Sequence, residues 1–268
     1  MRIKILVDNN TEGTLQAEWG LSLYIEYEGH RILLDAGTTG IFAENAEVLG
    51  ISLDEVELAV LSHAHYDHAD GFQRFFQENR SAKCYIQDCC GADCYDRKKD
   101  KYIGIREGLL ETYADRFVRV EGDYELLPGV TLLPHKTAGL GEIGEKVGMY
   151  RYRDGVWVPD DFSHEQSLVF ETKKGLVVCN SCCHGGVDHI IEETERTFPG
   201  KRVYALIGGL HLYKTSDDEV LALAEKIRET GIKKVYTGHC TGERAMELLK
   251  RKLGDMAEQI YTGMEIVL

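Results

Sequence analysis

Short apolar runs alternate with amphipathic segments along the chain, and only four prolines interrupt them. An apolar run bounded by turn residues predicts a strand, whereas apolar residues at helical spacing predict a helix. Strands are predicted at residues 2–7, 21–27, 31–34, 58–61, 83–87, 130–134, 168–172, 176–179, 203–207, 235–237 and 260–268. Helices are predicted at residues 37–50, 71–78, 187–194 and 243–253, and after the capping residue Ser216. This alternation of strands and helices indicates an α/β fold.

Nothing in the pattern divides the chain into separate domains. There is no linker rich in proline or serine and no break in composition, so a single domain over residues 1–268 is expected. Residues 89–106 are polar and rich in cysteine, and their structure is left open. Residues 136–160 carry five glycines together with Tyr150, Tyr152 and Trp157. Such a stretch inside a compact domain predicts a functional loop or a small hairpin.

Composition and charge narrow the functional classes. The 31 basic and 45 acidic residues give a net charge of −14. This balance argues against binding to nucleic acid or to anionic lipid, because both need a basic surface. The N-terminal segment turns polar at Asp8, too early for a signal peptide, and no apolar run approaches the length of a membrane span. A cytoplasmic protein without nucleic-acid or membrane partners is therefore expected.

The eight cysteines are expected to be thiols or metal ligands, since disulfides are rare in a reducing compartment. One group of four lies close together in the sequence: Cys84, Cys89, Cys90 and Cys94. This group contains no C-x-x-C pair and has no matching second half. Ordinary thiols are favoured there over a zinc or iron–sulfur site.

The strongest chemical signal is the H-x-H-x-D-H motif directly after the apolar run at 58–61. It brings His63, His65, Asp67 and His68 into one loop, followed by Gly71. Imidazole and carboxylate are good ligands for zinc and similar divalent metals. With ten histidines in this chain, the motif is expected by chance roughly once in a thousand such sequences. One compact loop cannot direct all four groups at a single ion, so the motif predicts two neighbouring ions completed by ligands from elsewhere.

Further motifs accompany this loop in sequence order. They are Val7-Asp8-Asn9, Leu34-Asp35-Ala36-Gly37, Ser181-Cys182-Cys183-His184-Gly185-Gly186, Gly208-Gly209-Leu210-His211-Leu212 and His239-Cys240-Thr241-Gly242. Together with the H-x-H-x-D-H loop they resemble one branch of the metallo-β-lactamase superfamily, the small metal-dependent hydrolases. Some members of this branch are called 7,8-dihydropterin-6-yl-methyl-4-(β-D-ribofuranosyl)aminobenzene 5′-phosphate synthases. The similarity extends from Val7 to Gly242 and is weakest over residues 89–160.

The resemblance implies an α/β fold of the α+β kind, the four-layer αββα metallo-β-lactamase sandwich. It also implies a metal centre in which His63 and His65 bind one ion, while Asp67 and His68 bind the other. His184 and His239 each follow a predicted strand, and the resemblance assigns both as further ligands. Two zinc ions are expected, with Mn²⁺ or Fe²⁺ as alternatives.

Other residues keep two interpretations open. His211 is a candidate metal ligand or substrate contact, and His164 is a candidate because classical relatives place their third zinc histidine there. Cys182 occupies the position of a bridging aspartate in many relatives, and it is either a thiolate ligand or a buried inert cysteine. The carboxylate of Asp35 is expected to accept a hydrogen bond from a ligand histidine and so orient its ring. The polar residues Asp8 and Asn9 are candidates for a similar role.

Several functions are compatible with this centre. The first is hydrolysis by metal-activated water, with Asp67 as a catalytic proton acceptor. The substrate would be a small ester, lactone or amide, and phosphorylated substrates are included. The second is a transferase that joins a pterin diphosphate to a ribosyl-aminobenzene phosphate. A di-iron redox protein is disfavoured because flavodiiron relatives carry glutamate at the position of His65. A non-catalytic metal-binding module is the fourth hypothesis. The substrate and the oligomeric state stay open.

Overall fold

The computed structural model describes residues 1–268, and the chain separates into two compact units. The first unit comprises Met1–Gly122, Ala138–Glu165 and Tyr261–Leu268. The second comprises Asp123–Thr137 and Gln166–Ile260. The expectation of a single domain over residues 1–268 stays a prediction.

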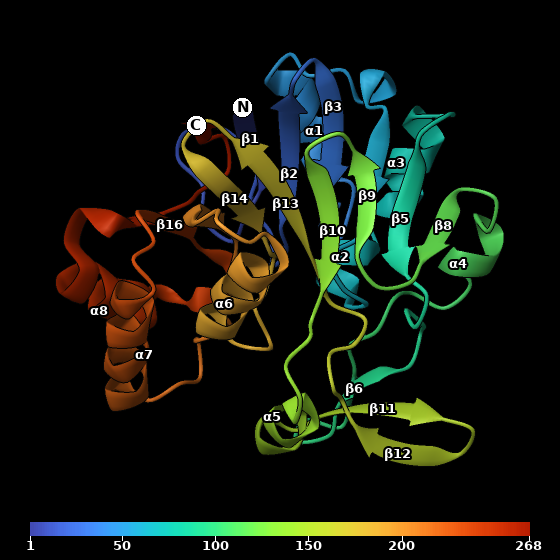
Figure 1. Ribbon diagram of the computed structural model, residues 1–268. Coiled ribbons are helices and arrows are strands. Elements are labelled where there is room, and N and C mark those ends of the chain that lie inside the picture. Colours follow the sequence, from blue (N-terminus) through green and yellow to red (C-terminus); the bar gives the residue numbers. More distant parts are fainter. The chain divides into compact units, whose positions relative to one another are not determined.

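A seven-stranded mixed sheet forms the centre of the first unit (Figure 1). Its strands in spatial order are β18 (Glu265–Val267), β1 (Arg2–Val7), β2 (Ser22–Tyr27), β3 (His30–Leu34), β4 (Leu58–Val60), β5 (Lys83–Gln87) and β8 (Phe117–Val120). Glu28 and Gly29, both at positive φ, form the tight turn between the antiparallel strands β2 and β3. β3, β4, β5 and β8 run parallel, so their carboxyl ends meet at one edge. Asp35 and Ser62 lie at that edge.

Short helices bury apolar residues in the first unit. They are α1 (Ile41–Val48), η1 (Leu53–Glu55), α2 (Tyr66–Ala69), α3 (Phe72–Glu78), α4 (Leu109–Thr112) and α5 (Leu140–Val147). Phe42 from α1 and Phe72 and Phe75 from α3 are fully buried in one core with the strands. Burying a side chain of this size stabilises a fold by about 1.5–3 kcal/mol. This core fixes the β4–α3 segment that carries the H-x-H-x-D-H motif.

The first unit also contains a four-stranded antiparallel sheet in the segments whose structure was hard to predict. Its order is β12 (Val156–Pro159), β11 (Met149–Arg153), β6 (Cys94–Asp96) and β7 (Lys101–Tyr102). The hairpin of β11 and β12 confirms the small hairpin expected within residues 136–160. Figure 1 shows α5 beside this hairpin.

The second unit is built on another seven-stranded sheet. Its spatial order is β17 (Ala257–Gln259), β16 (Lys234–Thr237), β15 (Val203–Ile207), β14 (Gly175–Cys179), β13 (Gln166–Thr172), β10 (Val130–Pro134) and β9 (Tyr124–Leu127). β9, β10, β13 and β14 pair antiparallel, whereas β14 to β17 pair parallel. The parallel part resembles an ordinary α/β unit, in which helices connect successive strands.

Helices α6 (Val187–Thr197), α7 (Asp217–Glu229) and α8 (Glu243–Leu253) connect these parallel strands, together with the short turns η2 (His239–Thr241) and η3 (Gly254–Met256). Their apolar faces share one core with β14, β15 and β16. α7 begins as predicted at Ser216, which forms a capping box with Glu219. None of the helices in the structure combines the length and apolarity needed to cross a membrane.

Most predicted strands and helices are present within a few residues of their expected bounds. The prediction of one strand over residues 260–268 was wrong, because only Glu265–Val267 pairs with β1. Gly263 has a φ of +93° and interrupts the extended backbone before that pair. The single helical turn α2 was not expected from the sequence.

Candidate metal centre

The H-x-H-x-D-H loop leaves the carboxyl end of β4 and is fastened to the segment that leaves β3. The backbone N–H of Ala36 donates to the carbonyl of His68 at 2.9 Å, and the N–H of Gly71 donates to the carbonyl of Gly37 at 3.1 Å. A Cβ on Gly71 would lie 1.9 Å from the carbonyl oxygen of Ala36. The φ of Gly71 is an ordinary helical −65°, so its backbone conformation does not require glycine. Glycine is needed here because two backbone segments approach closely.

The loop buries its imidazoles side by side. The ring of His63 lies 4.6 Å from the ring of His65 and 4.2 Å from the ring of His68, centroid to centroid. Asp67 occupies the first turn of α2, and its Oδ2 lies 3.9 Å from Nε2 of His68. All four residues are buried. The structure therefore brings the three imidazoles of the motif together.

Asp35 fixes the protonation of two of these imidazoles. Its Oδ1 accepts the backbone N–H of Ser62 at 2.7 Å, and its Oδ2 accepts the Ser62 hydroxyl at 2.6 Å and Nδ1–H of His68 at 2.8 Å. Because the Ser62 hydroxyl donates its proton to Asp35, its oxygen accepts Nδ1–H of His63 at 2.8 Å. We therefore assign the proton to Nδ1 in both rings, which leaves Nε2 of His63 and of His68 as lone-pair donors.

This arrangement fits a divalent metal. Neutral imidazoles that present Nε2, with the other ring nitrogen bonded to a carboxylate network, are the form in which histidine binds zinc. Asp35 orients the ring of His68 directly and that of His63 through Ser62, and the role of these histidines as metal ligands stays a prediction. Asp35 keeps this position at a φ of +59°, which costs energy for residues other than glycine and is tolerated best by asparagine and aspartate.

His164 lies beside the same loop but engages both of its ring nitrogens. Nδ1 accepts the backbone N–H of Ala64 at 3.1 Å, so Nε2 carries the proton and donates to Asp160 at 3.1 Å. Burial raises the pKa of Asp160, but the interaction with His164 outweighs it and lowers the pKa below its ordinary value. The ring lies 5.6 Å from that of His65. A role of His164 as metal ligand stays a prediction.

In the second unit, three loops leave the carboxyl ends of the parallel strands β14, β15 and β16 at one edge of the sheet. His184 belongs to the loop between β14 and α6, and His211 to the loop after β15. Their rings lie 4.5 Å apart. His239 follows β16 and begins η2, directly before α8. The strand-end positions expected for His184 and His239 are therefore present.

Two sulfurs accompany His211 at this edge. The Sγ atoms of Cys182 and Cys240 are 3.3 Å apart, and the backbone N–H of His211 donates to Sγ of Cys240 at 3.2 Å. Burial raises the pKa of the Cys240 thiol, but its hydrogen bonds with Cys182 and His211 outweigh that effect, so the pKa falls below its ordinary value. Ligand atoms of these three residues lie within 4.8 Å of one another. They form a donor set that suits zinc.

Backbone strain is concentrated at the same edge. Cys183, His211 and His239 adopt φ values of +48°, +52° and +47°. Each left-handed residue other than glycine costs roughly 1 kcal/mol, and such strain accumulates at functional sites. A Cβ on Gly209 would lie 2.4 Å from Sγ of Cys240, so the glycine leaves room for the thiol.

The remaining candidates support the backbone or stay apart. The Asp8 carboxylate accepts the backbone and side-chain N–H groups of Asn10 at 2.9 and 3.1 Å, and Asn9 accepts the backbone N–H of Gly20 at 3.2 Å. Both hydrogen-bond the segment after β1, and their role in supporting the metal ligands stays a prediction.

In the group of four cysteines that lie close together in the sequence, burial raises the pKa of Cys90 to about 12, which keeps it a neutral thiol.

Two residues of these sites were not expected to take part. Ser62 gives no signal in the sequence, because only the folded chain shows that its hydroxyl connects Asp35 to His63. Cys240 gives little signal in the sequence, because a single cysteine beside a histidine is uninformative by itself. Its position next to His239 in the H-C-T-G motif was the available signal.

Comparisons with known proteins agree with this geometry. The model of the metallo-β-lactamase superfamily matches residues 20–149. The crystal structure of Tm1679, described as a metal-dependent hydrolase of the β-lactamase superfamily, is 30% identical with a TM-score of 0.87 and covers 100% of this chain and 99% of its own. A Methanocaldococcus jannaschii protein named 7,8-dihydropterin-6-methyl-4-(β-D-ribofuranosyl)-aminobenzene-5′-phosphate synthase is 26% identical over 272 residues, 92% of this chain and 89% of its own.

A more distant structure shares the fold alone. Zn²⁺-bound PqqB from Methylobacterium extorquens is 11% identical, with a TM-score of 0.60 over 100% of both chains. The α/β fold class expected from the sequence is confirmed. Given the identity to Tm1679 over the whole chain and the superfamily match across the H-x-H-x-D-H loop, the protein belongs to the metallo-β-lactamase superfamily.

Proposed function

We propose that this protein is a hydrolase in which metal-activated water attacks a small ester, lactone or amide, phosphorylated substrates included. The observation that carries the proposal is the buried network of Asp35, Ser62, His63 and His68. This network holds two adjacent imidazoles in the tautomer that binds metal. Membership of a superfamily that includes metal-dependent hydrolases supports the same conclusion.

We propose that two divalent ions are bound. The ligands would be His63, His65, Asp67, His68, His184 and His239. Imidazole nitrogens with a carboxylate suit zinc, and Mn²⁺ or Fe²⁺ are the alternatives. Cys182 and His211 are further candidates, since their donor atoms lie close together with Sγ of Cys240. A thiolate in the set would favour zinc or Fe²⁺ over Mn²⁺.

Bound divalent ions would supply a water molecule acidified towards neutral pH and would polarise the electrophile. This chain's own residues orient the ligands and handle the proton. The carboxylate of Asp67 is buried on the first turn of α2, and we assign it the role of accepting the proton of the attacking water. Asp35 and Ser62 keep His63 and His68 from changing tautomer during the reaction.

The test is metal analysis combined with a screen of phosphoesters, lactones and thioesters on the wild type and His65→Ala. The variant should lose metal and hydrolysis together. His30→Ala is the matched control, because His30 is the first residue of β3 and pairs with Glu57 at the surface. Hydrolysis retained by metal-depleted His65→Ala would disprove the proposal.

A transferase is the second candidate. It is favoured by the name of the archaeal relative, which is a synthase rather than a hydrolase. The same metal ligands would then stabilise a diphosphate leaving group. Incubation with a pterin diphosphate and a ribosyl-aminobenzene phosphate separates the two hypotheses, because only the transferase releases diphosphate and forms the joined product.

We also propose that the protein acts on small molecules in the cytoplasm, without nucleic-acid or membrane partners. The net charge of −14 supports the absence of polyanionic partners. The eight cysteines, all present as thiols, are compatible with a reducing compartment.

A further inference from the structure

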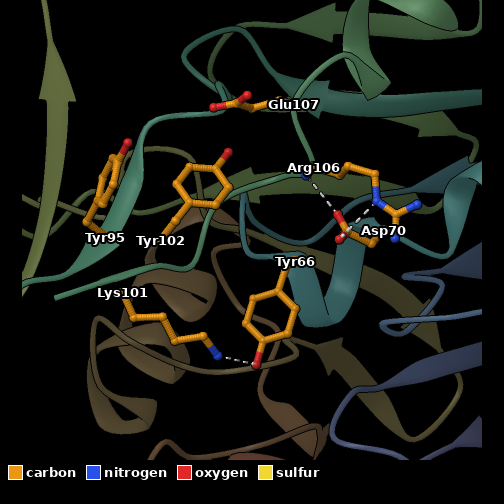
Figure 2. Close-up of a pocket in the computed structure, with 8 residues that line it drawn as sticks. Tyr66, Asp70, Tyr95, Lys101, Tyr102, Arg106 and Glu107 are labelled. Atoms are coloured by element: carbon orange, nitrogen blue, oxygen red, sulfur yellow. Dashed lines mark hydrogen bonds and ion pairs between the residues drawn. The ribbon is translucent and has the colours of Figure 1, made fainter. Parts of the chain in front are cut away.

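A cavity of about 450 Å³ opens in the first unit beside the H-x-H-x-D-H loop (Figure 2). Tyr66 and Asp70 line it from the loop and the end of α2, while Tyr95, Lys101, Tyr102 and Arg106 line it from β6, β7 and the segment after β7. A volume of this size suits a small-molecule ligand.

The cavity wall is hydrogen-bonded to the proposed metal loop. The backbone N–H of Tyr66 donates to the carbonyl of Ile103 at 3.0 Å, and His65 forms an isolated antiparallel bridge with Gly104. Tyr66 itself stands between His65 and Asp67 in the sequence. A ligand in the cavity would therefore contact the same loop that carries the proposed metal ligands.

The charges at the cavity favour an anion near Lys101. Its Nζ lies 4.6 Å from the centroid of the Tyr66 ring and donates to the Tyr66 hydroxyl at 3.3 Å, but it pairs with no carboxylate. Arg106 is already engaged, because its backbone N–H donates to Asp70 at 2.8 Å and its guanidinium to Gln73 at 2.8 Å. In Figure 2 the carboxylate of Glu107 lies away from Lys101, beyond Tyr102. Lys101 is thus the cation left to meet a ligand.

Aromatic rings form the other part of the wall. The rings of Tyr95 and Tyr102 lie 5.1 Å apart at 75°, and the Tyr95 ring meets Trp157 edge-on at 5.0 Å. Tyr102 is held in place by a hydrogen bond from its hydroxyl to the carbonyl of Ile105. Burial raises the pKa of Tyr102, so this ring stays a neutral phenol. Ring faces and edges fixed in this way favour contact with a planar aromatic group.

We propose that this cavity recognises the substrate through a planar aromatic group with an attached anion, a carboxylate or a phosphate, whose charge meets Lys101. This inference rests on the proposed function, since it assigns a substrate class to the same site. The aromatic group would lie against Tyr95 and Tyr102, and the bond to be cleaved would face the H-x-H-x-D-H loop.

Binding is measured on the full chain by saturation-transfer NMR titration, with metal loaded and with metal removed. Benzoate and phenyl phosphate are the probes, and their comparison separates carboxylate from phosphate. Cyclohexanecarboxylate has the charge without the aromatic ring, and benzamide has the ring without the charge. We expect at least one of the two probes to bind at least fivefold tighter than either control, whether or not metal is present.

Two variants locate the binding. Lys101→Met should weaken the preferred probe about tenfold, and Tyr95→Leu should reduce its advantage over cyclohexanecarboxylate. Lys99→Met is the matched control, because it removes the same charge from the same segment, where Lys99 pairs with Asp96. It should change affinity less than twofold.

The proposal is overturned if benzamide or cyclohexanecarboxylate binds as tightly as both probes, or if Lys101→Met and Lys99→Met behave alike. Binding to the metal-free chain does not depend on catalysis. Probe binding without any hydrolysis by the metal-loaded protein would therefore reject the proposed function alone, and hydrolysis without selective probe binding would reject the cavity proposal alone.

Discussion

Replacing Asp35 by asparagine removes one charge from the centre of the proposed metal-binding network and changes little else. The side chain keeps its size, and asparagine tolerates the positive φ of +59° at this position. Asp35 now accepts three hydrogen bonds, two from Ser62 and one from His68. An asparagine can accept at the position of Oδ1, but its amide would place N–H donors where Oδ2 receives two protons.

The two protons at Oδ2 then have to move. Nδ1 of His68 can meet an amide N–H only as an acceptor, so its proton shifts to Nε2, the nitrogen proposed to bind metal. The Ser62 hydroxyl accepts from the amide and donates to Nδ1 of His63, which shifts the second proton in the same way. Asp35→Asn therefore switches both rings into the tautomer that cannot bind metal through Nε2. Loss of such a partner lowers metal affinity about 10- to 100-fold.

Stability should fall as well. Hydrogen bonds to a buried carboxylate contribute about 1.5–3 kcal/mol each, and part of this is recovered by the amide. We expect the free energy of unfolding of the metal-free chain to drop by about 2–4 kcal/mol. Zinc affinity is measured by competition with a chromophoric chelator, and stability by urea unfolding in EDTA. Asp54→Asn, at an exposed position on η1, is the control that should change neither value.

The reasoning is refuted if Asp35→Asn binds zinc within twofold of the wild type. A loss of stability alone would show that Asp35 holds the strand ends together without controlling the histidines.

Three further predictions concern separate parts of the chain. Burial raises the pKa of Glu193, but hydrogen bonds from His135 and Thr137 outweigh it and lower the pKa to about 2. The ionised Glu193 should therefore contribute about 2 kcal/mol to the free energy of unfolding above pH 4.5, and this contribution should be lost as the pH falls towards 2. Measured by urea unfolding without metal, the stability of Glu193→Gln should depend less on pH in acid than that of the wild type. Gly71→Ala should lower the free energy of unfolding by more than about 3 kcal/mol or prevent folding, because its Cβ would lie 1.9 Å from a backbone oxygen. Gly141→Ala is the control on α5, where a Cβ meets open space, and it should be neutral or stabilising by up to about 1 kcal/mol. Equal unfolding midpoints for the two variants would contradict this. Asp67→Ala should fold normally by circular dichroism and lose at least about 100-fold in turnover, and full turnover would exclude its role as proton acceptor.

The sequence predicted the residues whose position depends on local spacing. His63, His65, Asp67 and His68 could be placed in one loop because they follow an apolar strand within six residues. The strand-end positions of His184 and His239 were likewise predictable from the apolar runs before them. Asp35 was expected to orient a ligand histidine; the structure shows its hydrogen bond to His68, and the role of His68 as a metal ligand stays a prediction.

What the sequence did not show depends on contacts between distant segments. Ser62 matters because Asp35 lies 27 positions away along the chain yet within 2.6 Å of its hydroxyl. The cavity beside Tyr66 is formed by β6 and β7, which are only three and two residues long and leave no periodic pattern. The left-handed backbone of His211 and His239 could not be predicted either, since only a few per cent of residues other than glycine adopt it.

The most direct test of the central claim is the metal content of the purified chain, measured by inductively coupled plasma mass spectrometry. The account predicts two equivalents of divalent metal per chain in the wild type. It predicts one equivalent or less in both His63→Ala and His239→Ala, because the proposal assigns metal ligands to both motifs. A wild type that holds no metal after exposure to zinc, or a His239→Ala variant with the full wild-type content, would contradict it.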